Sequence, residues 1–244
     1  GQAIAVNIRM PNSGASASYA KTDLTTIRDN HIKGSLGVFS MLGTDPNYSN
    51  VGIVDRLTIT NNLAWDIACS WSYAGCVADT IGPQYFRMVY GGKRYTITNN
   101  TLFGPTASTY MYNNAGDSSD PDIDSITFNN NVGPNGGYQW RTGGLGANEL
   151  SINGQFVTTT AGVDVRGNVF PGGSSSDWDG CTGGKLCGSN VYPTGAAFGD
   201  NTALLWRDPS NGDFTYQTSS TYRNNGLSGA LMGADMSTIP RLYN

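Results

Sequence analysis

The residues best placed to do chemistry are the carboxylates of one short run, Asp117, Asp120, Asp122 and Asp124. Ca²⁺ takes roughly six to eight oxygen ligands, so this run could supply much of a calcium site. Its spacing departs from the EF-hand loop, in which the ligands alternate up to a glycine and a distal glutamate. A solvated loop needs no metal and accounts for the same residues. We expect no cofactor, with Ca²⁺ at these four side chains as the alternative.

Three basic residues, Arg87, Lys93 and Arg94, are the candidates for lyase chemistry. A polysaccharide lyase needs an arginine or lysine base near its substrate and carboxylates that hold Ca²⁺. The spacing of these three does not distinguish them from ordinary surface charge. A glycoside hydrolase would need two carboxylates about 5–10 Å apart, and no motif marks such a pair. The sequence favours a protein without catalysis and leaves a carbohydrate-active enzyme, either lyase or hydrolase, as the alternative.

Aromatic side chains form a third candidate group, at Trp71, Tyr73 and Trp178. Exposed aromatic rings stack on sugars or fill protein interfaces, so these residues are candidate carbohydrate contacts. Packing within loops is the simpler interpretation. A glycan-binding or adhesion module is therefore a second alternative function. The only histidine, His31, has no accompanying serine or cysteine nucleophile motif, and we expect it to be structural.

The four cysteines fall into two local pairs, Cys69 with Cys76 and Cys181 with Cys187, each spanning a loop-like stretch. Zinc sites favour closer spacing and further ligands, and the chain has only one histidine. Two loop disulfides, Cys69–Cys76 and Cys181–Cys187, are the better interpretation. Because disulfides persist in oxidising compartments, we expect an extracellular or cell-surface protein.

The composition excludes several classes of protein. Charged residues make up 13% of the chain and the net charge is −4, against about 25% charged residues in ordinary domains. This acidic balance argues against a nucleic-acid partner, which selects for a basic stripe. The 11% of aromatic residues argues against disorder. No apolar run approaches the roughly 20 residues that a membrane span requires.

A repeat must position these candidates. A short run of alternating apolar and polar residues ends in asparagine five times along the chain. The final asparagines are Asn30, Asn62, Asn100, Asn131 and Asn168, at spacings of 32, 38, 31 and 37 residues. Alternation predicts a strand, and asparagine suits the turn that ends it. A strand–turn unit that recurs every 20–50 residues or so indicates a solenoid or a propeller.

One strong strand per repeat, with looser polar stretches between, favours a parallel β-helix over a propeller. Secondary strands are predicted near residues 38–42, 86–90 and 109–112, and helical periodicity is nearly absent. In such a fold the five asparagines stack at one corner, where their amides form a ladder along the axis. From about Tyr192 the pattern changes, and we expect a tail that packs over the last coil.

These repeats resemble the secreted bacterial right-handed parallel β-helix proteins of the pectin-lyase-like superfamily, most clearly at residues 57–62 and 126–132. The stretch from Gly212 to Asp235 is similar to the tail that closes many such proteins, although Thr221 stands where proline is usual. The resemblance covers roughly residues 3–239. It implies an all-β, right-handed solenoid, and it implies that the chain is the C-terminal part of the family's domain, since further N-terminal coils and a capping helix are usual.

The expected organisation is one domain, with parallel β-helix coils over residues 1–190 and a C-terminal coil and cap over residues 191–244. The preferred function is a non-catalytic extracellular structural protein that assembles end to end into a filament or a surface layer. An open first coil exposes strand edges that must be covered. The cover is a second copy in a homo-oligomer, a missing N-terminal segment or a separate chain. A polysaccharide is the other partner we consider.

Overall fold

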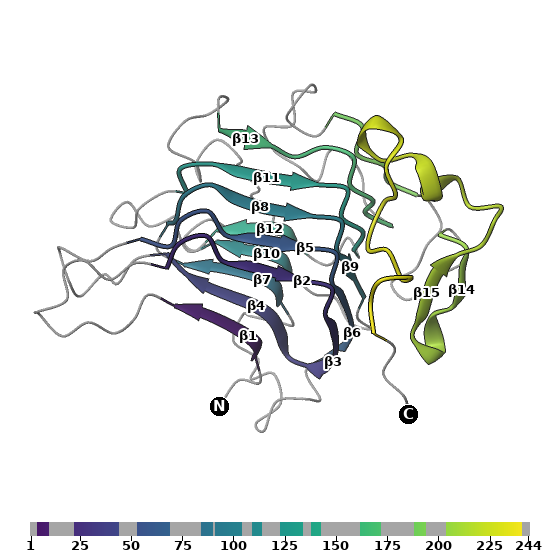
Figure 1. Ribbon diagram of the computed structural model, residues 1–244, viewed down its shortest axis with the longest axis horizontal. Helices are drawn as coiled ribbons and strands as arrows, with labels where there is room; N and C mark the ends of the chain where they lie inside the picture. The colour runs from purple at the N-terminus through teal and green to yellow at the C-terminus, as the bar shows by residue number, and fades with distance from the viewer. Residues whose placement is uncertain are drawn as a thin grey trace, which may run out of the picture.

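The computed structural model describes residues 4–9, 22–43, 53–68, 84–89, 91–103, 109–113, 123–133, 138–142, 162–171, 188–193 and 204–240. Within these ranges the protein is all-β, with three parallel sheets and no α-helix, as Figure 1 shows. The all-β class predicted from the sequence is confirmed. None of the helices in these ranges is long and apolar enough to cross a membrane.

Each of the three parallel sheets gains about one strand from each repeat of the chain. The first sheet contains β1 (Ile4–Arg9), β4 (Gly37–Leu42), β7 (Gln84–Val89), β10 (Thr109–Asn113) and β12 (Tyr138–Thr142). The second contains β2 (Thr26–Arg28), β5 (Thr58–Thr60), β8 (Tyr95–Thr98), β11 (Ile126–Asn129) and β13 (Val163–Asp164). The third contains β3 (His31–Ser35), β6 (Leu63–Ile67) and β9 (Thr101–Leu102). Chain order therefore runs from the second sheet to the third and then to the first within each repeat.

The pairing register keeps equivalent residues of successive repeats in line. Ile27 pairs with Ile59, which pairs with Ile97, so the apolar position of the second sheet stays in one column. In the first sheet the stacked rings of Phe39 and Phe86 lie 5.4 Å apart between centroids. The isoleucines of the second sheet alternate in sequence with polar residues, and a strand places alternate side chains on opposite faces. The core is consequently a narrow apolar strip shared by all the repeats.

The C-terminal segment lies beside the third sheet. It contains β14 (Trp206–Asp208), η4 (Pro209–Asn211), β15 (Asp213–Tyr216), η5 (Thr221–Asn224) and η6 (Leu227–Gly229), with β14 and β15 antiparallel. Figure 1 shows this segment running down the side of the stack, next to β9, β6 and β3. Trp206 and Phe214 pack in a second apolar cluster with Leu63, Val132 and Val169. The segment thus covers the flank of several repeats, rather than only the last coil as the sequence suggested.

Candidate functional site

Asparagine side chains form a continuous column at the corner between the second and third sheets. Asn30 Nδ2 donates to Asn62 Oδ1 at 2.9 Å, and Asn62 donates to Asn100 at the same distance. Asn100 continues to Asn131 at 2.9 Å and Asn131 to Asn168 at 3.1 Å. Each Oδ1 also accepts the backbone N–H of the preceding asparagine. All five asparagines proposed for the ladder therefore belong to one hydrogen-bonded chain.

A sixth asparagine extends the column. Asn168 Nδ2 donates to Asn190 Oδ1 at 3.1 Å, and the backbone N–H of Asn168 donates to the same oxygen at 2.9 Å. The sequence interpretation missed Asn190 because no alternating strand pattern precedes it. A signal was nevertheless present in the sequence. The apolar Val191 directly follows Asn190, just as Leu63, Val132 and Val169 directly follow earlier asparagines of the column. Val191 pairs with Val169 in the register of the earlier repeats.

The residue before each column asparagine has a left-handed backbone. The φ values are 59° at Asp29, 54° at Asn61, 55° at Asn99, 57° at Asn130, 64° at Gly167 and 61° at Ser189. Asparagine, aspartate and glycine tolerate this region better than other residues. This conformation turns the chain from the second sheet to the third, which explains why the repeats end in paired asparagines.

The first asparagine of each pair binds the C-terminal segment. Asn61 donates to Thr238 Oγ1 and accepts the N–H of Asp235, both at 2.6 Å. Asn99 donates to the carbonyl of Leu231 at 2.8 Å, and Asn130 Oδ1 accepts the N–H of Leu227 at 2.9 Å. The outer asparagines therefore hold the segment against the stack, while their neighbours form the inner column.

His31 anchors the distal end of this segment. Its Nε2 accepts the Trp65 indole N–H at 2.6 Å, and its Nδ1 lies 3.1 Å from the carbonyl of Pro240. Because Nε2 is an acceptor, Nδ1 carries the proton and donates a hydrogen bond to the carbonyl oxygen of Pro240. Burial lowers the pKa of His31, and the nearby positive charge of Lys33 lowers it further. The hydrogen bond to the Pro240 carbonyl raises the pKa but does not outweigh burial. The histidine is neutral and structural in this setting, and Lys33 lies 4.3 Å from the centre of the Trp65 ring.

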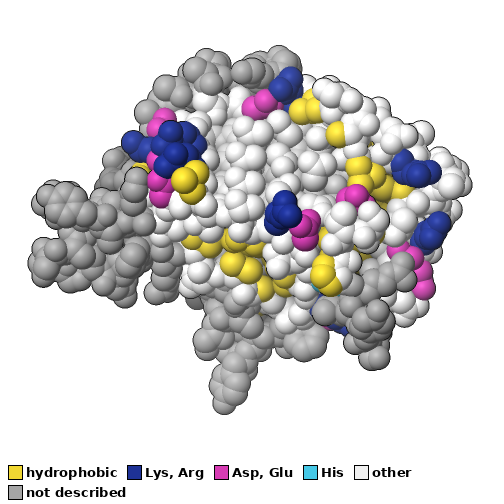
Figure 2. Space-filling view, in the orientation of Figure 1, with side chains coloured by type: hydrophobic (Ala, Val, Ile, Leu, Met, Phe, Trp, Pro, Cys, Tyr) yellow, Lys and Arg dark blue, Asp and Glu magenta, His cyan; other side chains and the backbone are white. Residues whose placement is uncertain are grey.

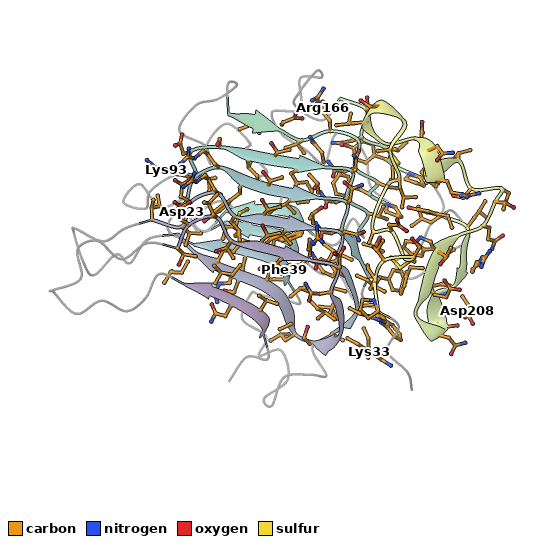
Figure 3. All side chains as sticks on the ribbon, viewed as in Figure 1. Asp23, Lys33, Phe39, Lys93, Arg166 and Asp208 are labelled. Atoms are coloured by element: carbon orange, nitrogen blue, oxygen red, sulfur yellow. The ribbon has the colours of Figure 1, made fainter. Side chains whose placement is uncertain are left out.

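The lyase candidates Lys93 and Arg94 lie in a column of charges at another corner of the stack. Asp23, Asp55 and Lys93 are paired in register across three successive repeats. The arginine that follows each of the last two positions, Arg56 or Arg94, extends its guanidinium to the aspartate of the preceding repeat. Arg56 pairs with Asp23, and Arg94 pairs with Asp55. Figures 2 and 3 show charged side chains gathered at this edge, where Asp23 and Lys93 lie close together. The Asp55–Arg94 hydrogen bond holds the pKa of Asp55 low and that of Arg94 high. A guanidinium bound in this way stays protonated and is a poor base.

Arg87 lies apart from that corner. It stands on β7 of the first sheet, in register with Ser40 of β4 and Tyr112 of β10, and its Nε is buried without a hydrogen-bond partner among the described residues. The structure therefore does not bring Arg87 together with the Asp55–Arg94 pair in one ion-pair network.

The remaining candidates fall mostly outside the described residues. These are the glycan candidates Trp71, Tyr73 and Trp178, the cysteines Cys69, Cys76, Cys181 and Cys187, and the acids Asp117, Asp120 and Asp122. Asp124 is described, and its backbone N–H donates to the carbonyl of Gly92 at 2.9 Å. Among the described residues, no three His, Cys, Asp or Glu side chains are grouped to hold a metal ion.

The two ends of the asparagine column differ in hydrogen-bonding character. At Asn30, which is exposed, Oδ1 accepts no hydrogen bond from any described residue. At Asn190 the oxygen is occupied by Asn168, and the backbone N–H finds no acceptor within the described ranges. One end of the column thus offers an acceptor and the other end offers a donor.

No protein-family profile, curated protein or solved structure matches the chain.

Proposed function

We propose that this chain is an extracellular structural protein, built as a right-handed parallel β-helix, that assembles end to end with copies of itself. The observation that carries the proposal is the polarity of the asparagine column. Among the described residues, Oδ1 of Asn30 and the backbone N–H of Asn190 have no partner, and they are the two halves of the bond that links every internal pair. A head-to-tail contact between copies continues that bond, and such a contact extends into a filament when the ring does not close.

The stacked sheets support the β-helix. Strands from successive repeats pair in parallel in all three sheets, and equivalent residues stay in one register. Repeats that stack in this way contact only their neighbours, as in a solenoid. The right-handed sense comes from the resemblance to the pectin-lyase-like superfamily.

The outer edge of β2 supports assembly at the Asn30 end. Thr58 donates its N–H to the carbonyl of Thr25 at 2.8 Å, and Thr58 is the register partner of Thr26. By the alternation of a parallel ladder, the N–H of Thr26 points the other way, where no described strand pairs with β2. Thr26, Arg28 and Asn30 are all exposed. An exposed strand edge is a template for pairing with another chain.

Leu24 adds an apolar contact at the same end. Its relative exposure is 68%, the only large hydrophobic residue this exposed within the described ranges. It has a left-handed backbone with φ 55°, like Arg56 and Arg94 at the equivalent corner of the next two repeats. Those arginines bind an acid of the preceding repeat. At the end of the stack, leucine stands in this place and suits contact with a second copy.

The extracellular location is supported by the composition. Only 13% of the residues are charged, and the described residues on the face drawn in Figure 2 show largely uncharged groups. The cysteine pairs, although outside the described residues, are typical of an oxidising compartment.

A substitution at Thr26 tests the assembly. Proline in Thr26→Pro removes the outward N–H and is tolerated on an edge strand, whereas Thr26→Ala keeps that N–H and serves as the matched control. We expect the unmodified protein and the alanine variant to form linear oligomers at high concentration by analytical ultracentrifugation and negative-stain microscopy. The proline variant stays monomeric.

Circular dichroism and thermal unfolding establish that the proline variant is folded, so that loss of assembly is not loss of structure. A native protein that remains monomeric at millimolar concentration contradicts the proposal. Oligomers that form equally well with proline at position 26 also contradict it.

A further inference from the structure

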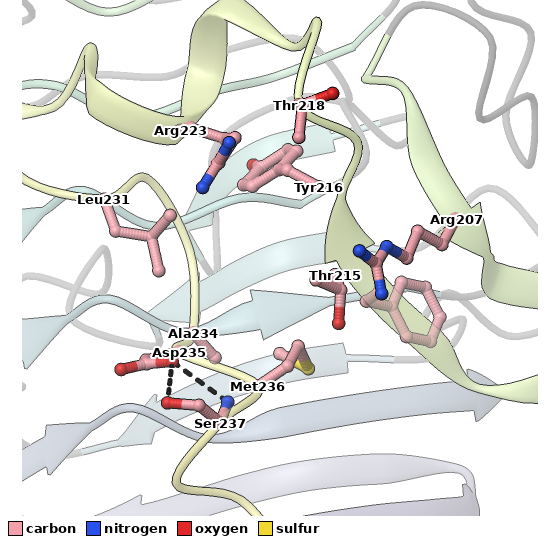
Figure 4. A pocket seen from close by; sticks show the side chains of 11 residues that line it. Arg207, Thr215, Tyr216, Thr218, Arg223, Leu231, Ala234, Asp235, Met236 and Ser237 are labelled. Carbon is pink, nitrogen blue, oxygen red and sulfur yellow. Dashed lines mark hydrogen bonds between the residues drawn. The ribbon is translucent and has the colours of Figure 1, made fainter.

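The C-terminal segment carries a cavity of about 340 Å³, at the lower end of the range for small-molecule sites. Its lining includes Arg207, Phe214, Tyr216, Arg223, Leu231 and Met236. In Figure 4, Arg223 and Arg207 lie on opposite sides of Tyr216. Leu231 lies below Arg223 in this view, and Met236 lies below Thr215.

The two arginines of the cavity differ from four other arginines of the described residues. Arg28, Arg56, Arg94 and Arg166 each pair with an aspartate. Arg207 and Arg223 make no ion pair or side-chain hydrogen bond to any described residue, and both are exposed. Arg207 and Arg223 therefore offer a ligand two guanidinium groups that have no ion-pair partner among the described residues, at a cavity whose one acidic lining residue is Asp235.

Acids lie nearby, but other groups occupy them. Asp208 accepts from Ser210 Oγ at 2.7 Å and from Asn211 Nδ2 at 2.8 Å, and these bonds lower its pKa. Asp235 accepts from the N–H and the hydroxyl of Ser237, as the dashed lines of Figure 4 show. The local turns thus engage both oxygens of Asp208 and one oxygen of Asp235, and neither acid forms an ion pair with Arg207 or Arg223 among the described residues.

We infer that this cavity binds a small organic carboxylate, held by Arg207 and Arg223, with an apolar body against Phe214, Leu231 and Met236. A guanidinium fork matches the two oxygens of a carboxylate. The charged lining residues are the two arginines and Asp235, so the site carries one net positive charge and suits a monoanion. Burial raises the pKa of Tyr216, which therefore stays neutral and adds no competing charge.

Calorimetric titration with benzoate tests this inference, with benzamide as the neutral analogue and inorganic phosphate as a plain anion. We expect benzoate to bind and benzamide not to compete. Replacing either arginine, as Arg207→Gln or Arg223→Gln, weakens benzoate binding by roughly tenfold, the size of one charge-assisted hydrogen bond. The double variant abolishes binding.

Arg28→Gln is the matched control, because it removes the same charge from an exposed arginine that is outside the cavity lining. It leaves benzoate affinity unchanged if the site is the cavity. The inference is overturned if benzoate fails to bind, if benzamide binds equally well, or if the double variant retains the affinity of the native protein. Phosphate that binds more tightly than benzoate also overturns it, since that marks a site for anions without an apolar body.

Discussion

Asn130 and Asn131 are adjacent in the chain, yet their side chains serve two different interfaces. Asn130 Oδ1 accepts the N–H of Leu227 in the C-terminal segment, while Asn131 Nδ2 donates to Asn168 inside the stack. The left-handed backbone at Asn130, with φ 57°, directs the two side chains apart. The same division holds at Asn61 and Asn62 and at Asn99 and Asn100. A dipeptide repeated in the sequence thus couples the stacking of repeats to the docking of a distant segment.

The inner column is expected to contribute strongly to stability at its buried rungs. Asn100 is fully buried, accepts from Asn62 and donates to Asn131 and to the carbonyl of Ile59. Asn100→Ala leaves those groups buried without partners, which costs about 3 kcal/mol of unfolding free energy. Asn30→Ala, at the exposed end, costs less than about 1 kcal/mol. Urea unfolding of both variants measures the difference, and equal losses would contradict the stronger contribution of the buried rungs.

The left-handed turn can be separated from the hydrogen bond that its side chain makes. Asn99→Gly and Asn99→Ala both lose the bond to the carbonyl of Leu231. Only alanine must also adopt φ 55° with a Cβ atom, at a cost of about 1–2 kcal/mol. We therefore expect the glycine variant to be the more stable of the two by about that amount in chemical unfolding. An alanine variant as stable as the glycine variant would refute the assigned role of the turn.

Acid is expected to release the end of the C-terminal segment through His31. Its pKa in the folded state lies below that of the unfolded chain, so the unfolded state binds more protons between the two values. Stability is therefore fully present above roughly pH 6.5, the ordinary histidine pKa, and falls as the pH drops through the folded value. Protonation also places a hydrogen on Nε2, which can then no longer accept the hydrogen bond from the indole N–H of Trp65.

His31→Gln removes this dependence, because glutamine does not titrate. Melting temperatures measured from pH 8 to pH 5 should fall more steeply for the native protein than for the glutamine variant. Hydrogen exchange at residues 235–240 locates the change. Parallel curves for the two proteins would show that the contact between His31 and Pro240 carries no pH sensitivity.

The outer asparagines should control the docking of the C-terminal segment without controlling the stack. Asn61→Gly removes the bonds to Thr238 and to the N–H of Asp235 but tolerates the left-handed turn with φ 54°, while Asn62 and its column remain. We expect faster hydrogen exchange around residues 235–238 and little change in β5 and β8. Uniformly faster exchange through all three sheets would contradict this separation.

The strand-and-asparagine repeat could be predicted from the sequence because its signal is local and periodic. The alternation at residues 57–62 and 126–132 identifies strands, and the regular asparagines identify their common corner. The docking path could not be predicted, because Asn61 and Thr238 are 177 residues apart and share no pattern.

The charge column illustrates what register adds. Asp23 and Asp55 each precede their column asparagine by seven residues, and so does Lys93. That spacing is visible in the sequence, but only the pairing of repeats shows that Arg94 reaches back to Asp55. Without the register, Lys93 and Arg94 resembled candidate bases. With it, Arg94 belongs to a structural ion pair.

Fibre diffraction from aligned, assembled protein tests the central claim most directly. If copies stack head to tail, the strands of the three parallel sheets lie across the filament axis, and a strong reflection near 4.8 Å falls on the meridian, parallel to that axis. The Asn30 and Asn190 ends then meet and the asparagine column runs on from one copy to the next. A 4.8 Å reflection on the equator would mean that copies associate side by side, and that result would contradict the account.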